Sequence, residues 1–157
     1  MTTRTTASAK PELWGLLDAI VEQLPPTKSK LEALLNVSFE RRIDRNKTTY
    51  FVCERVPPGS FGVTISTMSF HEPAGEHRGD LMMELTGADV GGDAIAARFP
   101  GGHWVPPPPP GWGGDDAGPA YLVDRPWGQL AFALAPGADA TIRRVSFALG
   151  LRGSPGI

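Results

Sequence analysis

The densest group of side chains suited to chemistry lies in the ten-residue stretch HEPAGEHRGD, residues 71–80. Imidazoles and carboxylates of the kind that bind zinc or nickel are supplied there by His71, Glu72, Glu76, His77 and Asp80. Their spacing differs from the H-E-x-x-H motif, and the proline and glycines within the stretch disfavour the helix that this motif requires. The stretch is typical of a solvated hairpin loop, and we predict no metal site in it.

A second acidic group, Asp115 and Asp116, follows Trp112 in the stretch GGHWVPPPPPGWGGDDAGPAY, residues 101–121. Two carboxylates beside an aromatic ring suggest glycoside hydrolysis, in which two acids flank the scissile bond. Catalytic groups must be held by supporting contacts, and adjacent residues in a glycine-rich loop have few of them. We therefore assign no catalytic role to this pair.

The sequence contains no complete nucleophile motif and no complete phosphate-binding loop. The glycines around Ser60 have the wrong offsets for G-x-S-x-G, and those of GGDAIAAR lack the phosphate-loop and dinucleotide-binding spacings. Cys53 falls inside a strand pattern, with Phe51 and Arg55 expected on the same side. This favours a small buried hydrophobe over a reactive thiolate. We predict that the protein is not an enzyme and has no cofactor.

The run from Pro106 to Pro110 favours a stiff polyproline helix. Three interpretations remain open: a strut or surface loop, a ligand for a partner's aromatic groove, and an interface loop. In the third, Trp104 and Trp112 would be apolar anchors around the acidic pair.

Composition predicts one globular domain over residues 1–157. Hydrophobic residues make up 41% of the chain and charged residues 20%, which is ordinary globular usage. We expect flexible ends at 1–10 and 152–157 and a Pro/Gly-rich loop at 101–119. A single cysteine excludes an intramolecular disulfide, and no run of 18 apolar residues occurs. These features predict a cytoplasmic protein without membrane association.

The net charge of −2 conceals an acidic middle of the chain, because residues 70–125 hold nine Asp/Glu against three Lys/Arg. Such a segment repels phosphate, which argues against nucleic acid as a ligand. It favours a protein partner with a basic surface.

Hydrophobic periodicity predicts the elements that must position these groups. Helical spacing covers 11–24 and 27–36, with Thr27 or Ser29 as the cap of the second helix. Alternation predicts strands at 37–43, 48–56, 63–70, 80–87, 120–124, 127–134 and 140–149. A short helix at 88–99 would be capped by Asp89, with Ile95 and Phe99 facing inward. The predicted class is α+β: a mostly antiparallel sheet of about seven strands, two N-terminal helices and one short inserted helix.

The segments RPWGQLAFAL and TIRRVSFAL, preceded by LEALLNVSFERR, TTYFVCERV and VTISTMSFHEP, resemble small proteobacterial immunity proteins of type VI secretion and polymorphic toxin systems. The resemblance spans Leu31 to Phe147. It implies a protein that neutralises a cognate toxin by tight binding and has no active site. It transfers no functional residues.

Together these observations predict a protein-binding domain whose partner is a basic-surfaced toxin or effector. The candidate partner-binding residues are His71, Glu72, Glu76, Asp80, His103, Trp104, Trp112, Asp115 and Asp116.

Two alternatives remain. One is a small-molecule or saccharide-binding domain, possibly enzymatic, with Trp104, Trp112 and Trp127 lining a cleft to which His103 or Asp115 supplies polarity. The other is an adaptor read through its polyproline loop.

Overall fold

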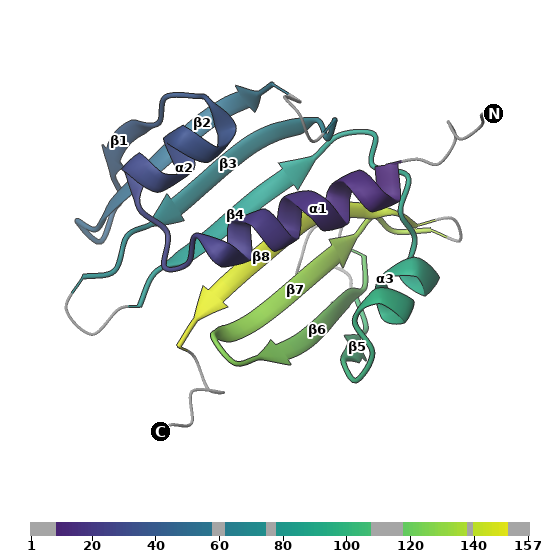
Figure 1. Cartoon of the computed structure of the whole chain (residues 1–157). Helices are drawn as coiled ribbons and strands as arrows, with labels where there is room; N and C mark the ends of the chain where they lie inside the picture. Colours follow the sequence, from purple (N-terminus) through teal and green to yellow (C-terminus); the bar gives the residue numbers. More distant parts are fainter. Residues whose placement is uncertain (1–8, 58–61, 75–77, 108–117, 138–139, 151–157) are drawn as a thin grey trace.

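Three helices cover one face of an eight-stranded antiparallel sheet in the computed structural model, which describes residues 9–57, 62–74, 78–107, 118–137 and 140–150 (Figure 1). The predicted α+β class is confirmed. The sheet has one strand more than expected, because residues 103–105 of the predicted loop form a strand. Of the predicted flexible ends, 1–8 and 152–157 lie outside the described residues, whereas Ala9 and Lys10 begin the first helix.

The helices begin close to the predicted positions, at α1 (Ala9–Glu22), α2 (Lys28–Leu35) and α3 (Gly92–Arg98). Thr27 caps α2, since its hydroxyl accepts a hydrogen bond from the Lys30 backbone N–H. The predicted cap of α3, Asp89, is wrong. Gly91 takes the N-cap position in an extended conformation without a side-chain hydrogen bond, and Asp89 lies two residues before it.

The strands form two four-stranded meanders joined along β4 and β8. The order across the sheet is β1-β2-β3-β4-β8-β7-β6-β5. Their bounds are β1 (Glu40–Ile43), β2 (Thr49–Val56), β3 (Ile65–His71), β4 (Asp80–Leu85), β5 (His103–Val105), β6 (Ala120–Arg125), β7 (Gly128–Leu134) and β8 (Ile142–Leu149). In Figure 1, α1 lies across β4, β8 and β7, whereas α2 lies over the β1–β3 end.

Strand pairing sorts the side chains onto two faces. One row across the helix-covered face consists of Cys53, Met68, Met83, Val145, Phe132, Tyr121 and Trp104. The buried core cluster contains the inward side chains of this face together with α1, α2 and α3 residues such as Leu17, Leu31 and Ile95. The helices therefore pack on this face, and we call the other one, which none of the described helices covers, the open face.

The expected placement of Arg55 is wrong. Arg55 has a positive φ of 65° and is exposed, and the register passes from the Glu54–Thr67 pair to the Val56–Ile65 pair. This bulge turns Val56, rather than Arg55, toward the core beside Cys53. Cys53 itself is half-buried, and burial raises the pKa of its thiol.

No helix among the described residues combines the length and apolarity needed to span a bilayer.

Candidate functional site

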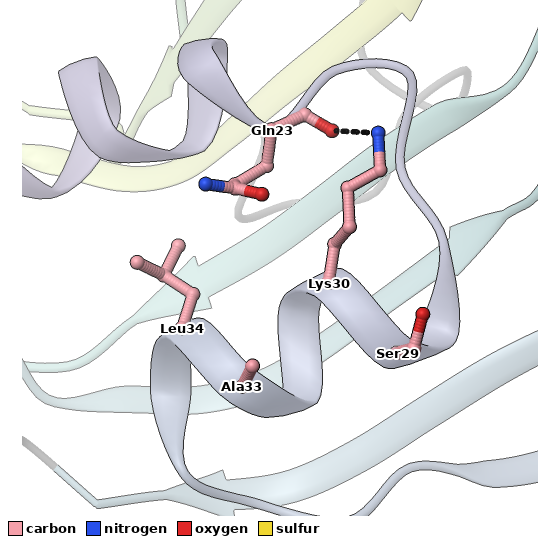
Figure 2. A pocket seen from close by; sticks show the side chains of 5 residues that line it. All are labelled: Gln23, Ser29, Lys30, Ala33 and Leu34. Atoms are coloured by element: carbon pink, nitrogen blue, oxygen red, sulfur yellow. Dashed lines mark hydrogen bonds between the residues drawn. The ribbon is translucent and has the colours of Figure 1, made fainter.

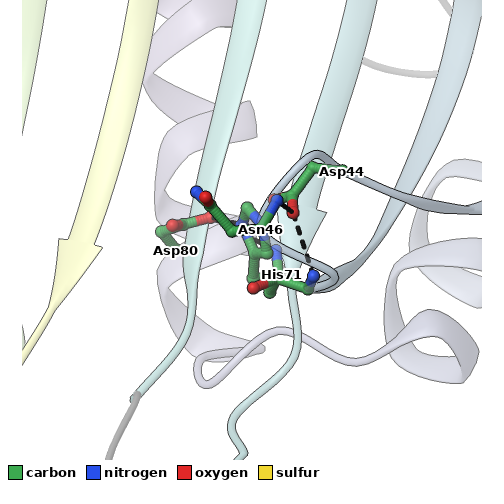
Figure 3. A network of polar contacts seen from close by, with 5 residues as sticks. Asp44, Asn46, His71 and Asp80 are labelled. Atoms are coloured by element: carbon green, nitrogen blue, oxygen red, sulfur yellow. Dashed lines mark hydrogen bonds and ion pairs between the residues drawn. The ribbon is translucent and has the colours of Figure 1, made fainter.

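His71 lies at the centre of a polar network at one end of the open face (Figure 3). It is the last residue of β3 and pairs with Asp80, the first of β4. Its Nδ1 lies 2.8 Å from Asp80 Oδ1, and its Nε2 lies 3.8 Å from Asp44 Oδ2. The Tyr50 ring lies beside it, with 5.8 Å between centroids. Each imidazole nitrogen therefore faces a carboxylate.

Asp44 joins this network through the β1–β2 turn. Its Oδ1 accepts the backbone N–H groups of Thr48 and Asn46, each at 2.9 Å. The hydrogen bond from Thr48 is the main reason that the pKa of Asp44 lies below its usual value. The network ties the turn to the ends of β3 and β4. Among the described residues, no group of three or more His, Cys, Asp and Glu side chains is arranged to hold a metal ion.

Glu72, the next residue along the chain, supports a helix. Its Oε2 accepts a hydrogen bond of 2.7 Å from the backbone N–H of Lys28, at the start of α2. A carboxylate at this position satisfies a backbone donor that the helix leaves unpaired and interacts favourably with the helix dipole. The structure thus gives Glu72 a role in joining α2 to the end of β3.

We expect Glu72→Ala to lower the free energy of unfolding by about 1 kcal/mol, since the start of α2 loses its charged acceptor. Urea unfolding followed by circular dichroism measures the change. Glu54→Ala is the matched control, because Glu54 is exposed on β2. Equal stability of the two variants would contradict the contact and leave Glu72 available to a partner.

His103 and Trp104 lie far across the sheet from this network, on β5, with β8, β7 and β6 between β5 and β4. His103 is on the open face and pairs with Leu122, whereas Trp104 pairs with Tyr121 on the helix-covered face. The structure therefore divides the described candidates into two groups: His71, Glu72 and Asp80 in one, His103 and Trp104 in the other. The remaining candidates, Glu76, Trp112, Asp115 and Asp116, lie outside the described residues.

The Trp104 ring rests on a fixed support. It lies 4.8 Å from the Tyr121 ring, and a Cβ added to Gly92 would approach its Cη2 to 2.8 Å. The Tyr121 hydroxyl donates to the Phe99 carbonyl at 2.7 Å and accepts from the Gly102 N–H at 3.0 Å. The support thus joins β6, the start of α3 and the segment that leads into β5. Trp127 packs elsewhere, 5.6 Å from the Phe147 ring.

The sequence does not single out Val105 or the Tyr121 support. The alternation in 120–124 already places Tyr121 and Val123 on one side of a strand. Nothing in the sequence shows that residues 103–105 pair with that strand.

A shallow depression of about 470 Å³ lies between the end of α1 and α2 (Figure 2). It is lined by Gln23, Ser29, Lys30, Ala33 and Leu34. The Lys30 ammonium donates to the carbonyls of Gln23 and Pro25, both at 3.2 Å. These bonds join the segment that follows α1 to α2, so the lysine has a structural role at the rim.

Comparisons with protein-family models, with curated proteins and with solved structures find no match to this chain. The geometry of the chain itself must therefore support any functional assignment.

Proposed function

We propose that this chain is a non-enzymatic protein-binding domain of the cytoplasm, which neutralises a basic-surfaced bacterial toxin or effector by direct contact, as immunity-type proteins do. The observation that supports this most is Trp104, whose side chain is 44% exposed on the terminal strand of the sheet. The exposed large hydrophobic residues of the described chain are Ile43, Trp104 and Val105. Two of these three lie on β5.

The fixed support makes Trp104 suitable as a binding anchor. Tryptophan is enriched among the residues that contribute most to protein interfaces. Contact with Tyr121 and Gly92 limits the motion of the ring before any partner arrives. Binding therefore costs less side-chain entropy than it would for a freely moving aromatic residue.

Charge around the anchor favours a basic partner. Asp93 lies in the first turn of α3, next to the glycine that the Trp104 ring contacts, and Asp89 precedes it; both are exposed. They belong to the acidic segment 70–125. Acidic groups at the rim of an aromatic contact steer a basic surface toward it and add specificity.

The backbone of β5 offers a second means of recognition. Because β5 ends the sheet and pairs with β6 along one side, its other edge can accept an added strand from a partner. Hydrogen bonds along the strand and the Trp104 ring would then act on the same partner segment.

We expect Trp104→Ala to weaken partner binding by about 30-fold, equivalent to about 2 kcal/mol for an interface anchor. The partner is captured with the tagged full chain from its native lysate, purified, and titrated against both forms by calorimetry. Co-expression with the partner then tests neutralisation, and Trp104→Ala should protect growth less well than the wild-type protein.

Ile43→Ala is the matched control, because Ile43 is 59% exposed on β1, at the opposite edge of the sheet. It should bind with wild-type affinity. The proposal fails if no purified protein binds directly, or if Trp104→Ala binds as tightly as the control. Full affinity in a peptide of residues 101–121 alone would instead support the polyproline adaptor.

A further inference from the structure

The open face carries unusually small side chains for a sheet surface that faces away from the helices. Its middle row across the sheet runs Glu40, Val52, Ser69, Met82, Ser146, Ala131, Leu122 and His103. The third row ends in Arg144, Ala133, Ala120 and Val105. Alanine and serine are poor strand formers, and a solvated antiparallel face usually carries longer polar residues.

Charged and polar groups border this small-residue surface. The first row lies at one end of the strands. It contains Tyr50, His71 and Asp80, and further across the sheet Gln129 and Asp124. At the other end the Glu84 and Arg144 side chains form a cross-strand ion pair of 3.6 Å. A centre of small, half-buried side chains within a polar border allows a second sheet to approach closely.

The arrangement of these residues is self-complementary. Consider a two-fold axis parallel to the strands that passes between β4 and β8 and relates two copies face to face. It brings β4 over β8, β3 over β7 and β2 over β6, because these pairs lie equally far from the centre of the sheet order. In the middle row, Met82 then lies over Ser146 and Ser69 over Ala131.

The same operation matches the charges. Glu84 of each copy lies over Arg144 of the other, while in the first row Tyr50 lies over Asp124 and His71 over Gln129. Both side chains are accessible to a second copy, with 40% of Arg144 and 44% of Glu84 exposed. Met82 thus lies over a serine, and the carboxylates of Glu84 and Asp124 lie over donor groups.

The area of the face also suits a stable dimer. Eight strands spaced about 4.8 Å apart span roughly 38 Å, and three rows of alternate residues span about 20 Å, or about 760 Å² per copy. A standard interface buries about 800 Å² per partner. Aligned sheets stack at about 10 Å, which small side chains permit.

We propose that the open face is a homodimer interface, in which a second copy of this chain packs its own open face against it across this two-fold axis. The interface is independent of the proposed function, because the Trp104 side chain lies on the helix-covered face.

Light scattering coupled to size exclusion, run across a dilution series, tests the dimer. The wild-type protein should show twice the chain mass of 16.8 kDa. Ala131→Arg should shift it to the monomer mass and raise the dissociation constant at least about 100-fold, since it places an unpaired charge in the contact. Ala97→Arg, at an exposed position of α3, should remain a dimer. Ser69→Arg provides a second open-face variant, and circular dichroism establishes that each one folds.

An exchange of charge tests the axis itself. Glu84→Arg and Arg144→Glu should each be monomeric alone, because each brings like charges together across the interface. Mixed in equal amounts, they should form a dimer, since every position 84 then faces an opposite charge at position 144.

Three results would overturn the proposal: a wild-type protein that is monomeric throughout, a dimer that survives Ala131→Arg, or a mixture of charge variants that stays monomeric. If the wild-type protein is monomeric and Ala131→Arg no longer binds a purified partner, the open face is the binding surface for that partner instead.

Discussion

Phe132→Ala is expected to lower the free energy of unfolding by about 4 kcal/mol, a large fraction of the stability of a domain of this size. Phe132 is fully buried in β7, an interior strand of the sheet. Its ring lies 5.3 Å from that of Phe99 and 6.4 Å from that of Trp14, between centroids. Truncation leaves a cavity at the point where α1 and the end of α3 both meet the sheet, and these elements cannot collapse into it without losing their other contacts.

Urea unfolding at constant protein concentration measures the loss, and Phe132→Leu is the matched control. Leucine retains most of the apolar contact, so its cost should be about 1 kcal/mol. Because Phe99 both contacts Phe132 and accepts the Tyr121 hydrogen bond, Phe132→Ala should also loosen the support of Trp104. A loss below about 1.5 kcal/mol would contradict this packing.

Local patterns identified the strands because most of them have one face in the core. The alternation in β7 places Leu130, Phe132 and Leu134 together, and the structure buries all three. The same holds for Ile95 and Phe99 around α3. Such periodicity depends on residues close in sequence, which is why it is readable without a structure.

What the sequence did not show depends on distant pairing. β5 has three residues between glycines and prolines, too few for alternation to be visible. The pairing of β4 with β8 joins residues 60 to 68 positions apart, and no local pattern encodes it. The hydrogen bond from Lys28 to Glu72 spans 44 positions. A carboxylate predicted to face a partner therefore turned out to bind the start of a helix.

The open face illustrates the same limit for the candidate sites. The alternation of WGQLAFAL predicts that Ala131 and Ala133 lie opposite the core residues of that strand. It does not show that Ser146, Ser69 and Met82 extend the same surface, because that requires the strand order. The surface argued to bind a second copy is thus a property of the topology.

The second large effect is expected at Gly128, where the β6–β7 turn enters β7. Its φ is 152°, and an added Cβ would meet the Ala148 carbonyl and lie 2.8 Å from Leu149 Cα. Both neighbours are backbone atoms of β8, which β4 holds on its other side. Gly128→Ala must therefore push β7 away from β8. We expect it to lower the free energy of unfolding by about 3 kcal/mol, from overpacking and backbone strain together.

Gly137→Ala separates the two causes in the same urea experiment. Gly137 has a positive φ of 113°, but an added Cβ there would meet no atom within 4 Å. The Gly137→Ala variant should lower the free energy of unfolding by only about 1 kcal/mol, from backbone strain alone. The difference between the two variants then measures the close approach of β7 to β8. If Gly128→Ala lost no more than Gly137→Ala, the two strands would be further apart than described, and the face-to-face alignment built on their register would lose its basis.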